Sequence, residues 1–164
     1  LCRQCAKFTQ NVLRDFLDER KERQNWMRTF VKFERSLVGK MTDWALKRKI
    51  WDSVMFYNYL QVAMGGPRKA GTAQYKQPAN AFFEVIDKYE PECIIVWGKR
   101  LWNNMPNERW QDGADIVVDG NHIATGYYLL SNGKRAKVVA VYHPSGGYSW
   151  DYWHKVIQGL LASI

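Results

Sequence analysis

The chain has 164 residues, of which 46% are hydrophobic and 15% aromatic, and it carries a formal net charge of +8. This composition excludes an intrinsically disordered chain and predicts one globular domain over residues 1–164 with a sizeable core. No run of about 18 apolar residues and no cleavable signal pattern occurs, so we expect a soluble, cytoplasmic protein without membrane contact.

The positive charge is concentrated in the first part of the chain. Residues 1–50 hold 13 Lys and Arg against 6 Asp and Glu, whereas residues 51–164 hold 11 against 10. A basic flank on a near-neutral body favours a polyanionic partner, with nucleic acid ahead of acidic membrane, because no segment resembles an amphipathic lipid anchor. A solvated basic helix face explains the same charge equally well.

The three cysteines argue against a disulfide framework, because their number is odd. Cys2 and Cys5 form a CxxC pair, and Cys93 lies about ninety residues further along the chain. A structural zinc or iron–sulfur site needs about four ligands at suitable spacing. We therefore expect neither a metal ion nor another cofactor.

Apolar periodicity predicts that the basic flank is helical. Residues 7–24 carry apolar side chains at the spacing of one helical face, with Thr9 as a candidate cap. A second helix is predicted over residues 25–38, where Gly39 ends it, and a short third helix over residues 42–50.

The rest of the chain alternates between strands and helices. Strands are predicted at 51–61, 93–98, 114–131 and 136–143, and helices at 78–90, after Lys99 and at 150–164. A Gly-rich basic loop occupies residues 65–74, and the SNGK sequence at 131–134 is a tight-turn signal. This alternation indicates a doubly wound α/β sheet with helices on both faces.

Polar residues follow three of the predicted strands, at the sheet edge where α/β proteins bind ligands. They are Asn58, Gly98 with a cation after it, and His143. The Asn58 amide offers an N–H donor beside a C=O acceptor, which matches the O4 and N3–H edge of uracil. The His143 ring is placed to donate a hydrogen bond to negative charge that develops on a departing base.

The residues after His143 suit phosphate binding. Pro144 fixes the backbone, and Ser145 with the N–H groups of Gly146 and Gly147 can bind a phosphate at close approach. Taken singly, each polar residue has an ordinary structural explanation, because an asparagine forms turns and a histidine packs.

Taken together, three motifs resemble the uracil-DNA glycosylase superfamily. They are FYNYLQ at 56–61, IIVWG at 94–98 followed by a helix, and YHPS at 142–145. Their order and spacing agree with the superfamily across residues 51–163, which is roughly two thirds of the chain. The resemblance implies a three-layer α/β/α fold around a central, mostly parallel, four-stranded sheet.

The resemblance also implies an activity, that of a monomeric DNA repair enzyme. Such an enzyme flips uracil or a related damaged base out of DNA and hydrolyses the N-glycosidic bond. Carried onto this chain, His143 stabilises the uracil anion and Asn58 reads the base edge. The expected DNA-backbone contacts come from Ser145, Gly146, Gly147, Arg68 and Lys69, and Tyr148 is the candidate wedge in the duplex.

The superfamily begins with a strand and a loop that carry a water-activating residue and an aromatic ring that stacks on uracil. Residues 1–50 contain no such pattern, and the CRQC sequence resembles the cysteine pair of the iron–sulfur branch only superficially. Asp52 begins its predicted strand instead of ending it. We therefore expect that this chain is a fragment that releases uracil slowly or not at all.

Two other functions fit parts of the sequence. A nucleic-acid-binding module on the same fold would use the basic helices without catalysis. A hydrolase with Ser145 as nucleophile and His143 or His154 as base is disfavoured, because Ser145 lies in no G-x-S-x-G elbow. The sequence contains no Walker-type phosphate loop.

Overall fold

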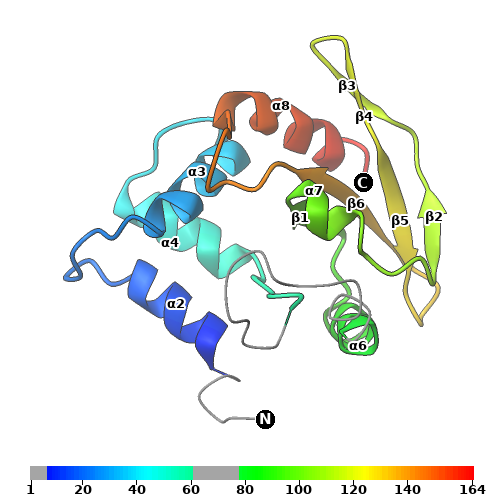
Figure 1. Cartoon of the computed structure of the whole chain (residues 1–164), viewed down its shortest axis with the longest axis horizontal. Coiled ribbons are helices and arrows are strands. Elements are labelled where there is room, and N and C mark those ends of the chain that lie inside the picture. Colours follow the sequence, from blue (N-terminus) through cyan, green and yellow to red (C-terminus); the bar gives the residue numbers. More distant parts are fainter. Residues whose placement is uncertain (1–6, 61–77) are drawn as a thin grey trace.

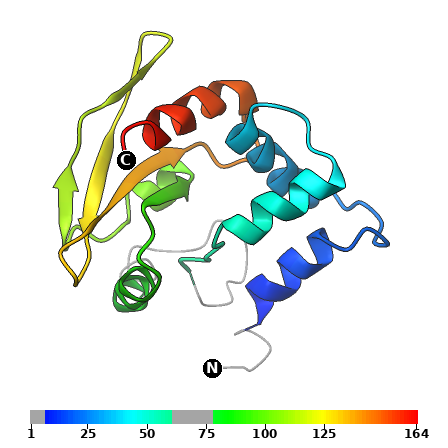
Figure 2. The same ribbon diagram turned by 180° about the vertical axis from the view of Figure 1, so that it is seen from behind.

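The computed structural model describes residues 7–60 and 78–164, and Figures 1 and 2 show it from opposite sides. The described helices are α2 (Phe8–Phe16), α3 (Met27–Val38), α4 (Trp44–Ser53), α6 (Ala79–Tyr89), α7 (Lys99–Trp102) and α8 (Trp150–Leu161). The described strands are β1 (Cys93–Trp97), β2 (Trp110–Asp112), β3 (Ile116–Val118), β4 (Asn121–Ile123), β5 (Thr125–Leu129) and β6 (Arg135–Val141). None of these helices is long and apolar enough to cross a membrane.

Most predicted elements lie where the sequence places them, including the three helices after residue 78 and strands β1 and β6. The first helix ends earlier than predicted, at Phe16, because Asp18 forms local hydrogen bonds with the residues that follow it. The Asp18 carboxylate accepts a hydrogen bond from the Arg20 backbone N–H at 3.1 Å, and the Asp18 backbone carbonyl accepts one from the Lys21 backbone N–H at 3.1 Å. Local bonds of this kind compete with helix continuation.

The four-stranded sheet has the order β1-β6-β5-β2 and is mixed. Only β1 and β6 are parallel, whereas β5 is antiparallel to β6 and β2 is antiparallel to β5. The prediction of a mostly parallel sheet is therefore wrong. The cause is the tight turn at Ser131–Lys134 between β5 and β6. The Leu130 N–H donates to Lys134 O across this turn at 2.8 Å. A connection this short joins only antiparallel strands, since parallel strands need a long crossover. Strands β3 and β4 form a separate hairpin.

The strand predicted at 51–61 does not form. Helix α4 continues through Trp51 to Ser53, because Ile50 and Trp51 extend its buried face. Asp43 caps the start of this helix by accepting the Leu46 N–H at 2.8 Å. Residues 54–60 then run as an irregular segment that belongs to neither sheet.

Each face of the sheet packs against a separate hydrophobic cluster. Alternate residues of β6 divide between them, with Val139 and Val141 on one face and Val138 on the other. The first cluster joins β6 to α3, α4 and α8, and the second joins it to α6. In Figures 1 and 2, α8 lies on one side of the sheet and α6 on the other.

A buried ion pair joins α3 to α4. Glu34 is 0% exposed and Lys47 is 2% exposed, and 3.1 Å separates Glu34 Oε1 from Lys47 Nζ. Trp51 Nε1 donates to Glu34 Oε2 at 3.0 Å, and Thr42 donates to the other carboxylate oxygen. Burial lowers the pKa of Lys47, and Glu34 opposes that shift. Lys47 Nζ also lies 4.1 Å from the centroid of the Phe16 ring. Because removing either charge would leave the other buried without its partner, the pair holds the two helices in one register.

We predict that Lys47→Met lowers the free energy of unfolding by about 3–5 kcal/mol, because it leaves the Glu34 carboxylate buried without its cation. Urea denaturation followed by circular dichroism measures this loss. Lys49→Met is the matched control, since Lys49 is exposed on the same helix and the change should stay within about 0.5 kcal/mol. Equal effects of the two substitutions would contradict the role of the pair.

Candidate functional site

The candidate site lies where β1 and β6 end side by side. Their register pairs Trp97 with Val141, and Gly98 N–H donates to Val141 O at 2.8 Å. Gly98 has φ +97°, and a Cβ on it would lie 3.4 Å from His143 Cβ. That separation is an ordinary van der Waals contact, but the positive φ would strain any residue with a side chain, so the backbone conformation favours glycine here.

The His143 ring is held by the residue two positions later. Ser145 N–H donates to His143 Nδ1 at 3.2 Å, and Ser145 Oγ lies 2.8 Å from the same nitrogen. A backbone N–H can only donate, so Nδ1 is an acceptor and the hydrogen-bond network assigns the proton of the neutral ring to Nε2. The loop therefore presents one imidazole N–H donor in a fixed tautomer.

Neighbouring groups also favour the neutral form of this ring. Trp97 stands edge-on to the imidazole, with ring centroids 6.0 Å apart. Desolvation by such neighbours lowers the pKa of His143 below its ordinary value of 6.5, although the residue as a whole remains exposed. At neutral pH the ring is therefore an uncharged donor.

We predict that His143 titrates with a midpoint below 6.5 in an NMR titration of the ring, with Nε2 carrying the proton above that midpoint. Because the pKa is lower in the folded chain, the unfolded chain binds more protons between the two pKa values. The contribution of His143 to stability is thus complete above the unfolded pKa and is lost as the pH falls through the folded one. A midpoint at or above 6.5 would contradict the assignment.

Asn58 lines the same groove as His143, but it follows no strand. It lies in the irregular segment 54–60, and its Nδ2 donates to Thr9 Oγ1 at 2.8 Å. Thr9 is therefore not a helix cap, since Lys7 holds that position in α2. The amino-terminal helix instead orients the Asn58 amide, a contact that no local sequence pattern signals.

The groove has a volume of about 1220 Å³ and brings several predicted residues together. His143, Ser145 and Gly146 line it from the loop after β6, and Asn58 lines it from the segment 54–60. The exposed residues Tyr142, Lys99 and Arg100 also line it. Lys99 Nζ lies 5.2 Å from the centroid of the Tyr142 ring. Tyr142 has no predicted role, although it directly precedes the HPS motif in the sequence.

Tyr148 is not presented to a ligand in this structure. Its side chain is 7% exposed and stacks on Trp153, and its hydroxyl lies 2.7 Å from Ser36 Oγ. Burial raises its pKa, so the hydroxyl stays protonated. Ser36 Oγ donates to Phe33 O, which leaves Tyr148 as the donor to Ser36. The expectation that Tyr148 contacts DNA as a wedge is therefore corrected, because its role here is to fasten the loop to α3.

We predict that Tyr148→Phe lowers the free energy of unfolding by about 0.5–1.5 kcal/mol, because one buried hydrogen bond is lost. Thermal and urea denaturation of Tyr148→Phe, Ser36→Ala and the double variant measure the coupling between the two hydroxyls. DNA affinity of Tyr148→Phe should remain within about twofold of the unmodified chain. Additive stability losses, or a large loss of DNA affinity, would contradict the anchoring role.

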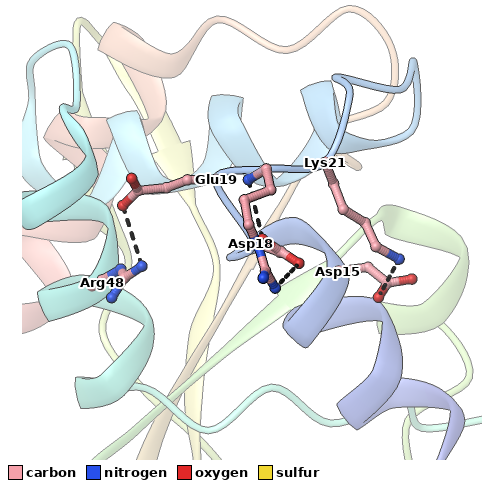
Figure 3. Close-up of polar contacts among 6 residues, drawn as sticks. Asp15, Asp18, Glu19, Lys21 and Arg48 are labelled. Carbon is pink, nitrogen blue, oxygen red and sulfur yellow. Dashed lines mark hydrogen bonds and ion pairs between the residues drawn. The ribbon is translucent and has the colours of Figure 1, made fainter.

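The acidic residues near the end of α2 form ion pairs with neighbouring cations, as Figure 3 shows. Asp15 pairs with Lys21 at 2.8 Å, and Glu19 pairs with Arg48 of α4 at 3.2 Å. Asp18 and Arg20 form a further pair at 3.0 Å. These exposed pairs contribute little to stability. Further exposed cations among the described residues of the flank are Lys7, Arg14, Arg23, Arg28, Lys40 and Lys49.

The remaining predicted residues form two pairs. Gly146 and Gly147 are exposed, and a Cβ on either would meet no atom within 4 Å. Arg68 and Lys69 lie outside the described residues. Within residues 7–60 and 78–164, no three His, Cys, Asp or Glu side chains are grouped to hold a metal ion.

Comparison with known proteins gives no match, whether to a protein-family model, to a curated protein or to a solved structure.

Proposed function

We propose that this protein is a DNA glycosylase of the uracil-DNA glycosylase type, with a three-layer α/β/α fold, and that it hydrolyses the N-glycosidic bond of uracil or a related damaged base. The base would be flipped out of DNA into the groove between the His143 loop and Asn58. The exposed glycines of the loop allow a phosphate to approach the backbone closely.

The observation that carries the proposal is the fixed, neutral His143 donor. When the bond from the sugar to the base breaks, its electron pair stays on the base and makes it an anion. A preorganised N–H donor stabilises such developing charge without reorganising during the reaction. Ser145 fixes the tautomer through two contacts to Nδ1, so the remaining ring proton on Nε2 is available to the base.

Asn58 supports the same proposal through its position and its remaining hydrogen-bonding capacity. One N–H of its amide is used by Thr9. The carboxamide retains its oxygen and a second N–H, which together match the N3–H and O4 groups of uracil. Cytosine presents the opposite pattern of donors and acceptors along this edge, so a fixed amide discriminates between the two bases.

A second candidate, a nucleic-acid-binding module without turnover, is favoured by one observation. Among the described residues that line the groove, Glu92 is the single carboxylate, and it precedes β1 at the end away from His143. Hydrolysis needs a group that orients the attacking water, and such a group contributes about 100- to 10,000-fold in rate. The described part of the groove has no carboxylate beside the His143 N–H donor.

In an active form of the protein, we predict that His143→Asn lowers the single-turnover rate of uracil release about 100- to 1,000-fold and changes DNA affinity less than about twofold. The substrate is a uracil-containing single strand, with abasic sites read by alkaline cleavage and affinity by fluorescence anisotropy. His122→Asn is the matched control, because His122 is an exposed histidine on the separate β3–β4 hairpin.

The outcomes separate the two candidates. Measurable uracil release by the unmodified chain contradicts the binding module without turnover. Equal losses of rate and affinity in His143→Asn would make the histidine a structural residue and would contradict the proposed mechanism. If His122→Asn also lowered uracil release or DNA affinity, the losses would reflect disturbed folding and not the chemistry of the site.

A further inference from the structure

An exposed aromatic ring lies at the end of the groove that reaches His143. Tyr142 directly follows β6, is 44% exposed and lines the groove. Its ring packs at an angle against the buried Trp153 of α8, with ring centroids 5.1 Å apart. Because a buried tryptophan supports the ring from one side, Tyr142 presents a fixed aromatic surface to solvent.

A cation from a different element adjoins this ring. Lys99, the first residue of α7, places its Nζ 5.2 Å from the centroid of the Tyr142 ring. Lys99 is exposed, and within residues 7–60 and 78–164 no carboxylate forms an ion pair with it. An exposed contact between a cation and a ring is weaker than a hydrogen bond between two charged groups. A phosphate therefore draws the Lys99 ammonium away from the ring and leaves the ring face open.

The charge of the groove differs between its two ends. Lys99 and Arg100 line the end that reaches His143, whereas Glu92 lines the end where β1 begins. Asp151, the first acidic residue after His143 in the sequence, does not line the groove. Cations beside an exposed ring suit a nucleic acid strand, because each nucleotide presents a phosphate and the flat face of a base. The charge at this end is thus complementary to such a strand.

The other end of the groove carries the same two residue types in different surroundings. Tyr89 of α6 is 57% exposed and lines the groove, and Lys88 Nζ lies 5.1 Å from the centroid of its ring. Glu90 and Glu92 follow in the sequence, and both are exposed. Because these carboxylates repel a phosphate, Tyr89 and Lys88 serve as a matched control within the same chain.

We propose that Tyr142 and Lys99 form a subsite for one nucleotide of single-stranded DNA, next to the position of the base that His143 contacts. A neighbouring base stacks on the Tyr142 ring, and Lys99 pairs with a phosphate of the strand. Such stacking needs an unpaired base with an open face, so the subsite selects single strands over duplex. The choice of DNA rests on the proposed function, whereas binding at the subsite requires no turnover.

Fluorescence anisotropy with labelled strands tests the subsite. One strand is an oligodeoxycytidylate of about ten nucleotides, and the other is an abasic strand of equal length that keeps the phosphates but lacks the bases. Cytosine does not match the Asn58 amide as uracil does, so a difference between the strands reports stacking. We expect Tyr142→Leu to weaken binding of the cytosine strand at least about fivefold and of the abasic strand less than about twofold. Tyr142→Trp keeps a stacking ring and should retain the affinity for the cytosine strand.

Further variants separate stacking from charge. Lys99→Met should weaken binding of both strands equally and reduce the slope of log affinity against log salt by about 0.7, because one phosphate contact is lost. Tyr89→Leu and Lys88→Met should each change the affinity for either strand less than about twofold. On the unmodified chain, NMR resonances of the Tyr142 ring should move upfield with the cytosine strand and not with the abasic strand. This measurement decides if Tyr142→Leu fails to fold.

Three results would overturn the proposal. They are equal effects of Tyr142→Leu on the two strands, a loss in Tyr89→Leu as large as that in Tyr142→Leu, and equal binding of the two strands by the unmodified chain. Neither strand contains uracil, and the glycosylase proposal is judged by uracil release. Failure of the subsite is therefore distinct from failure of the proposed function.

Discussion

Pairing of β6 along both of its edges is the constraint on which the candidate site depends. Its register with β1 brings Trp97 opposite Val141, so that Gly98 and the His143 loop leave the sheet together. A shift of one residue would exchange the two faces of β6 and move Val139 out of the cluster formed with α8. The hydrogen bond from Gly98 N–H to Val141 O then closes the end of the parallel pair. The position of His143 is therefore a consequence of the register between β1 and β6.

The helical flank belongs to the same body as the sheet. Its inner face supplies Phe16, Phe30 and Phe33 to the cluster that contains β6, while its exposed face carries cations. The buried pair of Glu34 and Lys47 fixes α3 relative to α4. Through Tyr148 and Ser36, α3 in turn holds the loop that carries His143. The basic segment and the candidate site are therefore parts of one packed structure.

Patterns within short windows predicted most of the helices and the two parallel strands, because burial on both faces leaves continuous apolar runs such as CIIVW. These local patterns failed where the local structure depends on contacts with residues that are far away in the sequence. Residues 51–61 have the composition of a strand. Helix α4 nevertheless continues to Ser53, because Ile50 and Trp51 extend its buried face, and residues 54–60 are irregular. His143 and Ser145 were assigned to one site from local sequence. The contact of Asn58 with Thr9 and the burial of Tyr148 arise from segments that are distant in sequence, so no local pattern contains them.

Anchoring of the loop also has a thermodynamic consequence. The segment from Val141 to Tyr148 is held by the sheet at one end and by α3 at the other, and the turn between them is closed by the Gly146 N–H on His143 O at 3.3 Å. Its conformational entropy is therefore lost during folding and not during ligand binding. A ligand that contacts this loop meets groups already in place, so affinity there depends on the contacts formed and on the deformation of the ligand itself. Under the proposed function, unpaired nucleotides would then be preferred over stacked ones, because they adopt the required shape more easily.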